Sequence, residues 1–236
     1  MTNIAIIGAS GAIGSPFVEQ FSNQSQVNKI YAFSRSEKAF SSKKVIIGKI
    51  DLLDEASIVK ASEAIADKLD AVIVASGVLH DDKVNPEKSL RDLSAEKFAY
   101  NFAVNATGPA LVMKYFLPKL QTEEKAIFAA LSARVGSISD NQLGGWYAYR
   151  AAKAALNMLI KNTAIEMNRR HKKMILVGLH PGTVDSNLSK PFSASVAADH
   201  LFSPEKAVAD LIKVLEGLSI ANSGKIFAYD GKEILP

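Results

Sequence analysis

The sequence that decides the fold reads Asn3-Ile4-Ala5-Ile6-Ile7-Gly8-Ala9-Ser10-Gly11-Ala12-Ile13-Gly14. Its first half is apolar and rich in isoleucine, which predicts a buried strand. Three glycines follow with the spacing G-x-x-G-x-x-G, and an amphipathic segment containing Phe17, Val18 and Phe21 comes next. The stretch therefore predicts a strand, a tight turn and a helix.

A turn of this kind can hold a pyrophosphate. Glycine permits unusual backbone dihedrals and close approach, so that backbone N–H groups and the N-terminus of the following helix point at the anion. The strict G-x-G-x-x-G spacing is absent, and a purely structural turn is the alternative.

Short apolar runs alternate with helix-like stretches along the rest of the chain. The runs lie at Ile30–Ser34, Val45–Lys49, Ala71–Ala75, Ala126–Leu131, Ile175–Leu179 and Ile226–Tyr229. Helices are expected over Asp54–Leu69, Ala95–Leu117, Tyr147–Asn168 and Pro204–Leu218, the last with Ser203 as N-cap. Strands separated by crossover helices predict an α/β fold: a single Rossmann-like, doubly wound parallel sheet of about seven strands with helices on both faces.

A second motif, Tyr149-Arg150-Ala151-Ala152-Lys153, opens a long helical run. Side chains at i and i+4 share one face of a helix. A phenol titrates near pH ~10 and moves protons poorly at neutral pH unless a nearby cation stabilises its phenolate, and Lys153 can supply that cation. An isolated pair of this kind is more often an ordinary surface tyrosine and lysine, so the interpretation depends on the rest of the chain.

Together these features resemble the short-chain dehydrogenase/reductase family, whose members combine a glycine-rich first turn with Tyr-x-x-x-Lys and an upstream serine. The resemblance covers nearly the whole chain. It extends to Asp51-Leu52, to Asn105 in Val104-Asn105-Ala106-Thr107-Gly108, to Ser132, and to Pro181-Gly182-Thr183-Val184-Asp185-Ser186. Within the family the chain is most similar to C-factor and sniffer-type carbonyl reductases, through Gly144-Gly145-Trp146-Tyr147-Ala148-Tyr149-Arg150, Ala155-Leu156-Asn157 and the ending 224–232.

The resemblance implies a catalytic role for four residues. Tyr149 is expected to be the general acid toward a carbonyl being reduced, and Ser132 a second hydrogen-bond donor to the same oxygen. Lys153 is expected to bind the nicotinamide ribose, and Asn105 to position a water in the proton relay. A hydride that arrives at carbon leaves charge on oxygen, which prepositioned donors stabilise. Asn105 as a helix kink and Ser132 as a satisfied loop hydroxyl are the alternatives.

Cofactor choice depends on the residues after the second strand. NAD sites commonly place a carboxylate there, whereas an arginine accommodates a 2′-phosphate. Here Ser34 occupies the acidic position and Arg35 follows, which favours NADP(H) over NAD(H), unless Arg35 is only a solvated loop residue. The resemblance places the cofactor against Gly8, Ser10, Gly11, Ala12, Ile13, Gly14, Ser34, Arg35, Asp51, Leu52, Ala75, Ser76, Gly77, Asn105, Tyr149, Lys153, Pro181, Gly182, Val184 and Ser186. In this set Asp51 and Leu52 flank the adenine, and Val184 and Ser186 hold the nicotinamide carboxamide.

Three positions depart from the family pattern. Ala12 stands where the second family glycine is expected. Val74-Ala75-Ser76-Gly77 replaces the usual Asn-Asn-Ala-Gly, so the asparagine that supports the central sheet is missing and Ser76 is expected to substitute for it in part. Ser132 lies farther from Tyr149 than in most members, which leaves Ser137 as an alternative catalytic serine.

Composition excludes several other classes. Hydrophobic residues make up 48% of the 236 residues without a membrane-length run, and no basic leader precedes Asn3, so a single cytoplasmic domain spanning residues 1–236 is expected, with no membrane partner. The chain has no cysteine, and its 4 histidines lack ligand spacing, so no metal is expected.

The charge balance raises one further class. A net charge of +4 is compatible with nucleic-acid binding through Arg169-Arg170-His171-Lys172-Lys173. That run follows a helix whose negative end it complements, and no aromatic residues lie between the charges. No nucleic-acid partner is therefore expected.

These observations predict an NADP(H)-dependent oxidoreductase that acts on a small-molecule carbonyl or alcohol. A cofactor-binding regulatory protein with little turnover is one alternative; a sugar-nucleotide epimerase or dehydratase is another, disfavoured because that class usually carries a larger second domain. A substrate lid is expected at about residues 187–202. Its apolar residues indicate either an apolar substrate or lid packing: Leu188, Pro191, Phe192, Val196 and Leu201.

The two long helices also predict a homodimer or homotetramer, because their apolar residues exceed one narrow stripe. These residues are Ala99, Phe102, Ala103, Ala106, Ala110, Met113, Ala151, Ala155, Met158, Leu159 and Ile165.

Overall fold

A computed structural model describes residues 2–36, 38–195 and 201–236. Within these residues seven parallel strands form one sheet in the order β3-β2-β1-β4-β5-β6-β9. The strands are β1 (Thr2–Ile7), β2 (Val27–Ser34), β3 (Val45–Lys49), β4 (Ala71–Val74), β5 (Ala126–Leu131), β6 (Met174–His180) and β9 (Lys225–Ala228). The predicted doubly wound parallel sheet is confirmed.

The strand order reverses at β1. This strand pairs with β2 on one side and with β4 on the other, so the connections leave it in opposite directions. In sheets of this kind a crevice opens beyond the carboxyl ends of the strands at the reversal. The glycine turn follows β1 directly and therefore borders that crevice.

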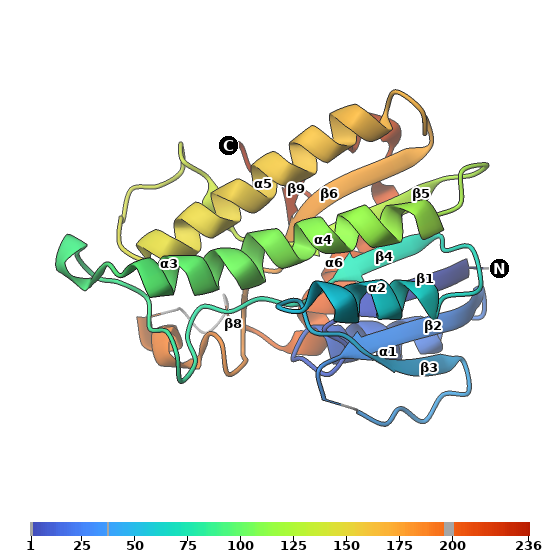
Figure 1. Ribbon diagram of the computed structural model, residues 1–236, viewed down its shortest axis with the longest axis horizontal. Coiled ribbons are helices and arrows are strands. Elements are labelled where there is room, and N and C mark those ends of the chain that lie inside the picture. The colour runs from blue at the N-terminus through green and yellow to red at the C-terminus, as the bar shows by residue number, and fades with distance from the viewer. Residues whose placement is uncertain (1, 37, 196–200) are drawn as a thin grey trace.

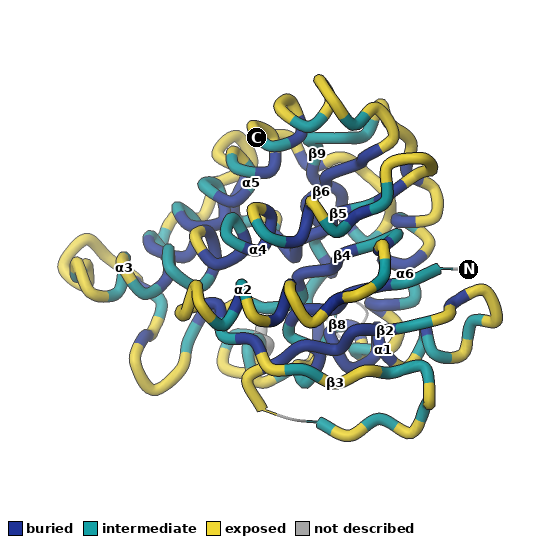
Figure 2. The backbone as a smooth tube through the Cα atoms, turned by 45° about the vertical axis from the view of Figure 1, so that its right-hand side comes forward, coloured by how far each residue is buried: buried dark blue, intermediate teal, exposed yellow. Residues whose placement is uncertain are grey.

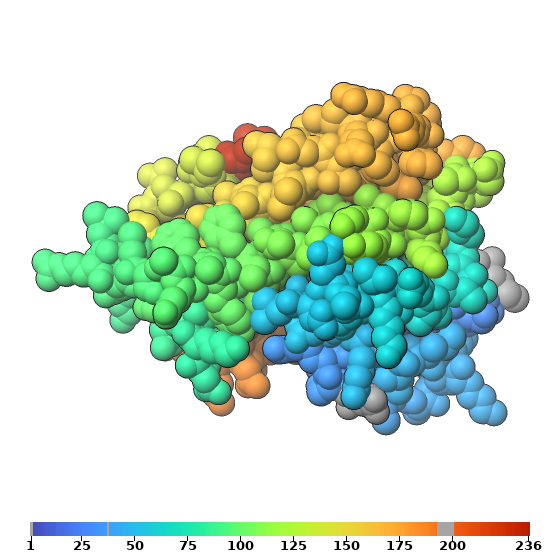
Figure 3. Space-filling view, viewed as in Figure 1, coloured from blue at the N-terminus to red at the C-terminus, as the bar shows by residue number. Residues whose placement is uncertain are grey.

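Helices cover both faces of the sheet (Figure 1). On one face lie α2 (Glu55–Glu63), α3 (Ala95–Phe102), α4 (Gly108–Phe116) and α5 (Tyr147–Met167), which form a continuous layer in the space-filling view (Figure 3). On the other face lie α1 (Gly14–Ser22) and α6 (Pro204–Gly217). The sheet is therefore buried between two helical layers.

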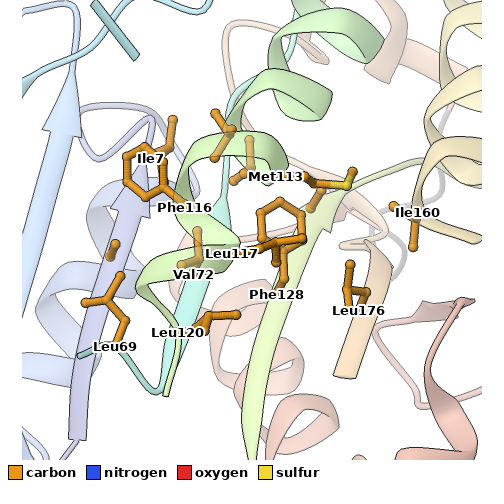
Figure 4. Packing of buried hydrophobic residues seen from close by; sticks show 14 of the residues in the cluster. Ile7, Leu69, Val72, Met113, Phe116, Leu117, Leu120, Phe128, Ile160 and Leu176 are labelled. Atoms are coloured by element: carbon orange, nitrogen blue, oxygen red, sulfur yellow. The ribbon is translucent and has the colours of Figure 1, made fainter. Parts of the chain in front are cut away.

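Each face of the sheet has its own apolar core. Phe116, Phe128 and Leu176 are fully buried under the layer that contains α4 and α5, where Figure 4 shows them packed side by side. Phe17 and Leu211 are fully buried on the opposite face. Figure 2 shows the central strands buried and β3, at the edge, largely exposed. Alternate residues of each strand thus supply the two cores.

The predicted helix starts are confirmed, but one helix ends early. The Asp54 side chain accepts from the backbone N–H of Ala56, and Ser203 caps α6 in the same way through Lys206. The helix that begins after Asp54 was expected to reach Leu69 and ends at Glu63. Beyond its end, the carboxylate of Asp67 accepts hydrogen bonds from Lys29 and Tyr31, so tertiary contacts with β2 replace the continued helix in this part of the chain.

The expected continuous helix over residues 95–117 is interrupted. It consists of α3, a π-helical segment at Ala103–Thr107 and α4, with Ser94 capping the start. Single π-helical turns inside α-helices occur frequently at functional sites. Asn105 lies in the middle of this one.

Shorter elements complete the fold. β7 (Thr183–Val184) and β8 (Leu201–Phe202) form a small separate sheet. Short helical turns lie at Leu90–Asp92, Leu117–Lys119, Arg134–Gly136, Lys190–Ser195 and Ile220–Asn222. Val196, which belongs to the predicted lid, lies outside the described residues. No helix formed by the described residues has the length and apolar character needed to cross a membrane.

Candidate active site

A cavity of about 730 Å³ lies at the carboxyl ends of the central strands. Its volume is within the usual range for small-molecule and cofactor sites. It is lined by these predicted residues: Gly8, Ser10, Gly11, Ala12, Ile13, Ser34, Arg35, Asp51, Leu52, Ala75, Ser76, Gly77, Ser132, Tyr149, Lys153, Pro181, Gly182, Val184 and Ser186. Two predicted residues, Gly14 and Asn105, are not part of the lining.

The glycine turn brings backbone against backbone. Gly8 has φ +88°, and a Cβ at Gly14 would lie 2.0 Å from the Gly8 carbonyl oxygen. Gly14 is therefore required for packing α1 against the turn, and its predicted contact with a cofactor stays a prediction. Ile13, at the N-cap of α1, has no side-chain oxygen to occupy the first N–H groups of the helix. The start of α1 is thus suited to an anion.

Tyr149 and Lys153 lie close together in the lining of the cavity. Both lie in the first turns of α5 and are buried, with 8% and 2% of their surface exposed. The Lys153 ammonium nitrogen lies 5.6 Å from the centre of the Tyr149 ring and donates a hydrogen bond of 2.8 Å to the carbonyl oxygen of Leu131. A Cβ at Gly136 would lie 2.8 Å from Cβ of Lys153, so the loop after β5 can approach this helix only without a side chain there.

Burial moves both pKa values in this pair. It lowers the pKa of Lys153 from 10.5 to about 7, because the charged ammonium loses its water. It raises the pKa of Tyr149 above that of a free phenol. The lowering of the tyrosine pKa expected from the motif is therefore not present in the protein without cofactor, where the neighbouring lysine is itself only partly charged near neutral pH.

Ser132 has a different hydrogen-bond partner from the one expected. It is 4% exposed at the end of β5, and its hydroxyl donates to Oδ1 of Asn157 at 2.6 Å. A hydroxyl has one proton. The donor role toward a substrate oxygen requires this proton and stays a prediction.

Ser137, the alternative serine, lies outside the cavity lining. Its hydroxyl accepts from the backbone N–H of Asp140 and lies 3.3 Å from the Ser139 hydroxyl. It therefore closes a local turn, and of the two serines only Ser132 reaches the cavity.

Asn105 lies outside the cavity lining and holds the loop after β4. It is fully buried; its Oδ1 accepts from the backbone N–H of Val78 at 3.1 Å, and its Nδ2 donates to the Val78 carbonyl at 2.8 Å. The π-helical segment turns this side chain toward the loop after β4. The side chain thus fixes the loop that carries Gly77, whose hypothetical Cβ would lie 3.1 Å from Oδ1.

The end of β2 carries no carboxylate. The Ser34 hydroxyl donates to the Ser36 carbonyl at 2.6 Å, and the Ser36 hydroxyl lies 3.4 Å from that of Ser10 in the glycine turn. The exposed Arg35 lines the cavity beside them. Asp51, at the end of β3, uses one carboxylate oxygen to accept from the backbone N–H of Leu53.

An aromatic row at the Tyr149 end of the cavity was not predicted as a site. Ring centroids are 6.5 Å apart for Trp146 and Tyr149, 5.0 Å for Trp146 and Phe192, and 5.6 Å for Phe192 and His80. Nε2 of His80 also lies 2.8 Å from the carbonyl oxygen of Asn187, and this contact connects the segment expected to be a lid with the loop after β4. Sequence signals existed for Trp146, through its place beside the tyrosine motif, and for Phe192, as an apolar residue of the expected lid, but not for His80.

Three polar residues of the lining were also missed. The Tyr100 hydroxyl donates to Asp81 at 2.7 Å, and both residues reach the cavity from outside the predicted motifs. His180 ends β6; burial lowers its pKa from 6.5 to about 4, and it is therefore neutral at neutral pH. No group of His, Asp or Glu in the part of the chain that the structure describes has the arrangement of a metal site.

The comparison with protein families identifies the chain. Residues 2–197 match the model of the short chain dehydrogenase family. The chain belongs to this family. It is accordingly an oxidoreductase of the short-chain type, and the resemblance inferred from the two motifs is confirmed.

Two relatives of this short-chain dehydrogenase carry different names, one of a signal and one of a dehydrogenase. C-signal of Myxococcus xanthus is 34% identical over 146 residues, which cover 62% of this chain and 82% of that protein. The 1-hydroxy-2-glutathionyl-2-methyl-3-butene dehydrogenase of Rhodococcus sp. (strain AD45) is 29% identical over 236 residues, covering 98% of both chains.

Solved structures share the fold over the full length. The NADPH-bound carbonyl reductase from chicken fatty liver has a TM-score of 0.86 at 24% identity, covering 100% of this chain and 99% of that one. The carbonyl reductase Sniffer of D. melanogaster has a TM-score of 0.84 at 20% identity, with 100% of both chains covered.

Proposed function

We propose that this short-chain dehydrogenase is an NADP(H)-dependent carbonyl reductase or alcohol dehydrogenase, with Tyr149 as its acid/base residue. The observation that carries the proposal is that Tyr149 and Lys153, both buried, line the same cavity as the glycine turn. In folds of this kind a dinucleotide binds across the crevice that the glycine turn borders.

The residues present fit such a cofactor. The close packing of Gly8 and Gly14 leaves the start of α1 free for a pyrophosphate, and Gly77 leaves room beside the Lys153 ammonium. Arg35 and the hydroxyls near it suit a 2′-phosphate, since a guanidinium forms charge-assisted bonds with phosphate oxygens and no carboxylate stands at Ser34 to repel it. The NADPH-bound state of the chicken carbonyl reductase agrees with this choice. When bound, the cofactor supplies or accepts the hydride.

The chain's own residues then handle the proton. Tyr149 donates its hydroxyl proton to the carbonyl oxygen as charge develops there, and Lys153 holds the ribose while its charge favours the phenolate that remains. The raised pKa of Tyr149 in the free protein keeps this proton in place until a charge appears beside it. Asn105 fixes the position of the loop after β4 through its hydrogen bonds to the backbone of Val78.

The test is oxidation of NADPH by the purified protein with a panel of aldehydes and ketones, with Tyr149→Phe as the matched control. Turnover by the wild type that is lost in the variant supports the proposal. Tight binding of NADPH with no turnover across the panel would contradict it and favour a regulatory cofactor-binding protein instead.

A further inference from the structure

The loop before α5 holds its residues in an unusual backbone conformation. Gly144, Gly145 and Trp146 all have positive φ, at 63°, 64° and 51°. Two of them are glycines, for which this region is accessible, but Trp146 is the one non-glycine residue with positive φ among the described residues. Such a conformation persists only where the surroundings over-determine it, and it occurs preferentially at functional sites.

Glu87 and Arg150 hold this loop. The backbone carbonyl of Glu87 accepts from the Trp146 N–H at 2.6 Å, and Glu87 Oε2 accepts from the N–H of Ala148 at 3.2 Å. From the other side the Arg150 guanidinium donates to the carbonyls of Gly144 and Gly145 at 3.2 and 3.1 Å. Glu87 thus supplies, from a distant loop, the cap that Trp146 cannot give to the start of α5.

Glu87 is otherwise unexplained. It is 2% exposed, and its second carboxyl oxygen is buried without a hydrogen-bond partner among the described residues. Burying an acidic side chain costs free energy, which its contacts must offset. The contacts that Glu87 makes here fix the position of Trp146.

The held conformation directs the indole into the cavity. Trp146 lies edge-on to Tyr149, with ring planes at 70°, and edge-on to Phe192 of the lid segment, at 61°. All three rings line the cavity. A substrate whose carbonyl oxygen reaches the Tyr149 hydroxyl therefore has its carbon substituents beside the indole.

We propose that Trp146 is a specificity-determining residue of this site and that Glu87 is the residue that positions it. The inference rests on the proposed function: Trp146 forms an apolar wall next to Tyr149 that favours a flat, apolar substituent on the carbonyl over a short aliphatic chain. Rings that meet an aromatic wall gain contact area and edge-to-face attraction, whereas a short chain leaves much of the wall uncovered.

The first test compares benzaldehyde and butanal as substrates of three variants. Trp146→Gly removes the ring and keeps a residue that accepts positive φ, Trp146→Phe restores an aromatic ring, and Leu143→Ala is the control, a 92% exposed position in the same loop. We expect Trp146→Gly to lower kcat/KM for benzaldehyde by about 10-fold or more and to leave butanal within about 3-fold, with Trp146→Phe in between. An unchanged ratio of the two substrates, or an equal loss for both, overturns the assignment.

The second test does not depend on turnover. The chain contains 1 tryptophan, so its fluorescence reports Trp146 alone. Saturable quenching by benzaldehyde in the presence of NADP⁺, weaker by about 10-fold or more in apparent affinity for butanal, is expected even if no aldehyde is reduced. Absence of turnover with this quenching preserved would refute the proposed function alone, and absence of quenching refutes the role of Trp146.

Glu87 is tested through the same signal. Glu87→Gln keeps an oxygen for the Ala148 N–H, whereas Glu87→Ala does not. In Glu87→Ala we expect the emission of Trp146 to shift to longer wavelength and the preference for benzaldehyde to be lost, as in Trp146→Gly. In Glu87→Gln we expect the emission and the preference to stay near those of the wild type. Affinity for NADPH, measured in the same samples, shows whether each variant is folded. Wild-type emission and preference in a folded Glu87→Ala protein would overturn the positioning role.

Discussion

The hydroxyl oxygen of Ser132 lies 2.6 Å from Oδ1 of Asn157, two turns along the helix from Tyr149. As long as this bond is kept, it uses the only proton of the hydroxyl, and Ser132 has no donor left for a substrate oxygen. We expect Ser132→Ala to lower kcat by less than about 10-fold, in contrast to the 10²-fold or greater loss typical of a donor to a developing oxyanion. Steady-state kinetics of Ser132→Ala and Asn157→Ala measure this.

The bond should instead contribute to stability. A side-chain hydrogen bond of this kind contributes about 1 kcal/mol, so a double-mutant cycle of Ser132→Ala and Asn157→Ala should give a coupling of that size in the free energy of unfolding. If Ser132→Ala lowers kcat by about 10²-fold and the double-mutant cycle shows no coupling, Ser132 acts as a second hydrogen-bond donor to the substrate oxygen.

Tyr149→Phe tests the acid. The variant keeps the buried ring and removes the proton, so we expect kcat to fall by about 10²- to 10⁴-fold. The dissociation constant for NADPH, followed by tryptophan fluorescence, should change little because the hydroxyl acts mainly in the transition state. A variant that keeps a tenth or more of the wild-type kcat would exclude Tyr149 as the acid.

Lys153 should make stability depend on pH. Its folded pKa, about 7, lies below the value of 10.5 for the free side chain. Between these values the unfolded chain binds a proton that the folded protein lacks, so the contribution of this group to the free energy of unfolding increases as pH rises through this window. Relative to Lys153→Met, the cofactor-free wild type should gain about 3 kcal/mol between about pH 6.5 and pH 9.5.

Denaturant unfolding of both proteins at the two pH values gives this difference, in which the other titrating groups cancel. A difference that does not change with pH would mean that Lys153 keeps its ordinary pKa in the folded protein.

Arg35 should determine cofactor preference. A guanidinium bound to a 2′-phosphate contributes about 1.5–3 kcal/mol, or roughly 10- to 150-fold in affinity, which NADH does not gain. Arg35→Ala should therefore weaken NADPH alone, and Ser34→Asp should repel NADPH and strengthen NADH. Titration of both cofactors decides the assignment, since equal dissociation constants in the wild type are incompatible with it.

An oligomer is expected through α5. Met158 and Ile165 are 60% and 50% exposed on this helix, whereas Met113 of α4 is 3% exposed and faces the core. Light scattering should give at least a dimer mass for the wild type and a monomer mass for the Met158→Glu, Ile165→Glu double variant. A monomer mass for the wild type at micromolar concentration removes this prediction.

The sequence predicted those parts of the molecule that local rules determine. The turn at Gly8 and the caps at Asp54 and Ser203 depend on short-range chemistry, and the structure has them where the patterns indicated. The alternation of apolar runs and helices was enough for the sheet, because a parallel sheet needs a crossover between its strands.

The sequence did not predict features that arise from contacts between distant segments. Asp67 bonds to β2 beyond the end of α2, Asn157 accepts a hydrogen bond from the Ser132 hydroxyl, and Glu87 caps a helix far along the chain. The motif predicted a cation beside Tyr149 but not the burial of the pair, which raises the pKa of Tyr149 and lowers the pKa of Lys153 in the protein without cofactor. Gly14 and Asn105 were assigned to cofactor contact by resemblance; neither lines the cavity, packing and hydrogen bonds hold them beside it, and the contact stays a prediction.

The π-helical segment at Ala103–Thr107 amounts to one residue more than a regular α-helix needs to cover the same length. Deleting a single residue there should restore a regular helix and rotate everything that precedes the deletion by about 100° relative to α4, the angle between successive residues. Asn105 would then no longer reach Val78, although the glycine turn and the pair of Tyr149 and Lys153 would be intact. A length change of one residue in this helix is therefore a way for a protein of this fold to lose its active site while it keeps the tyrosine and lysine by which the site is recognised.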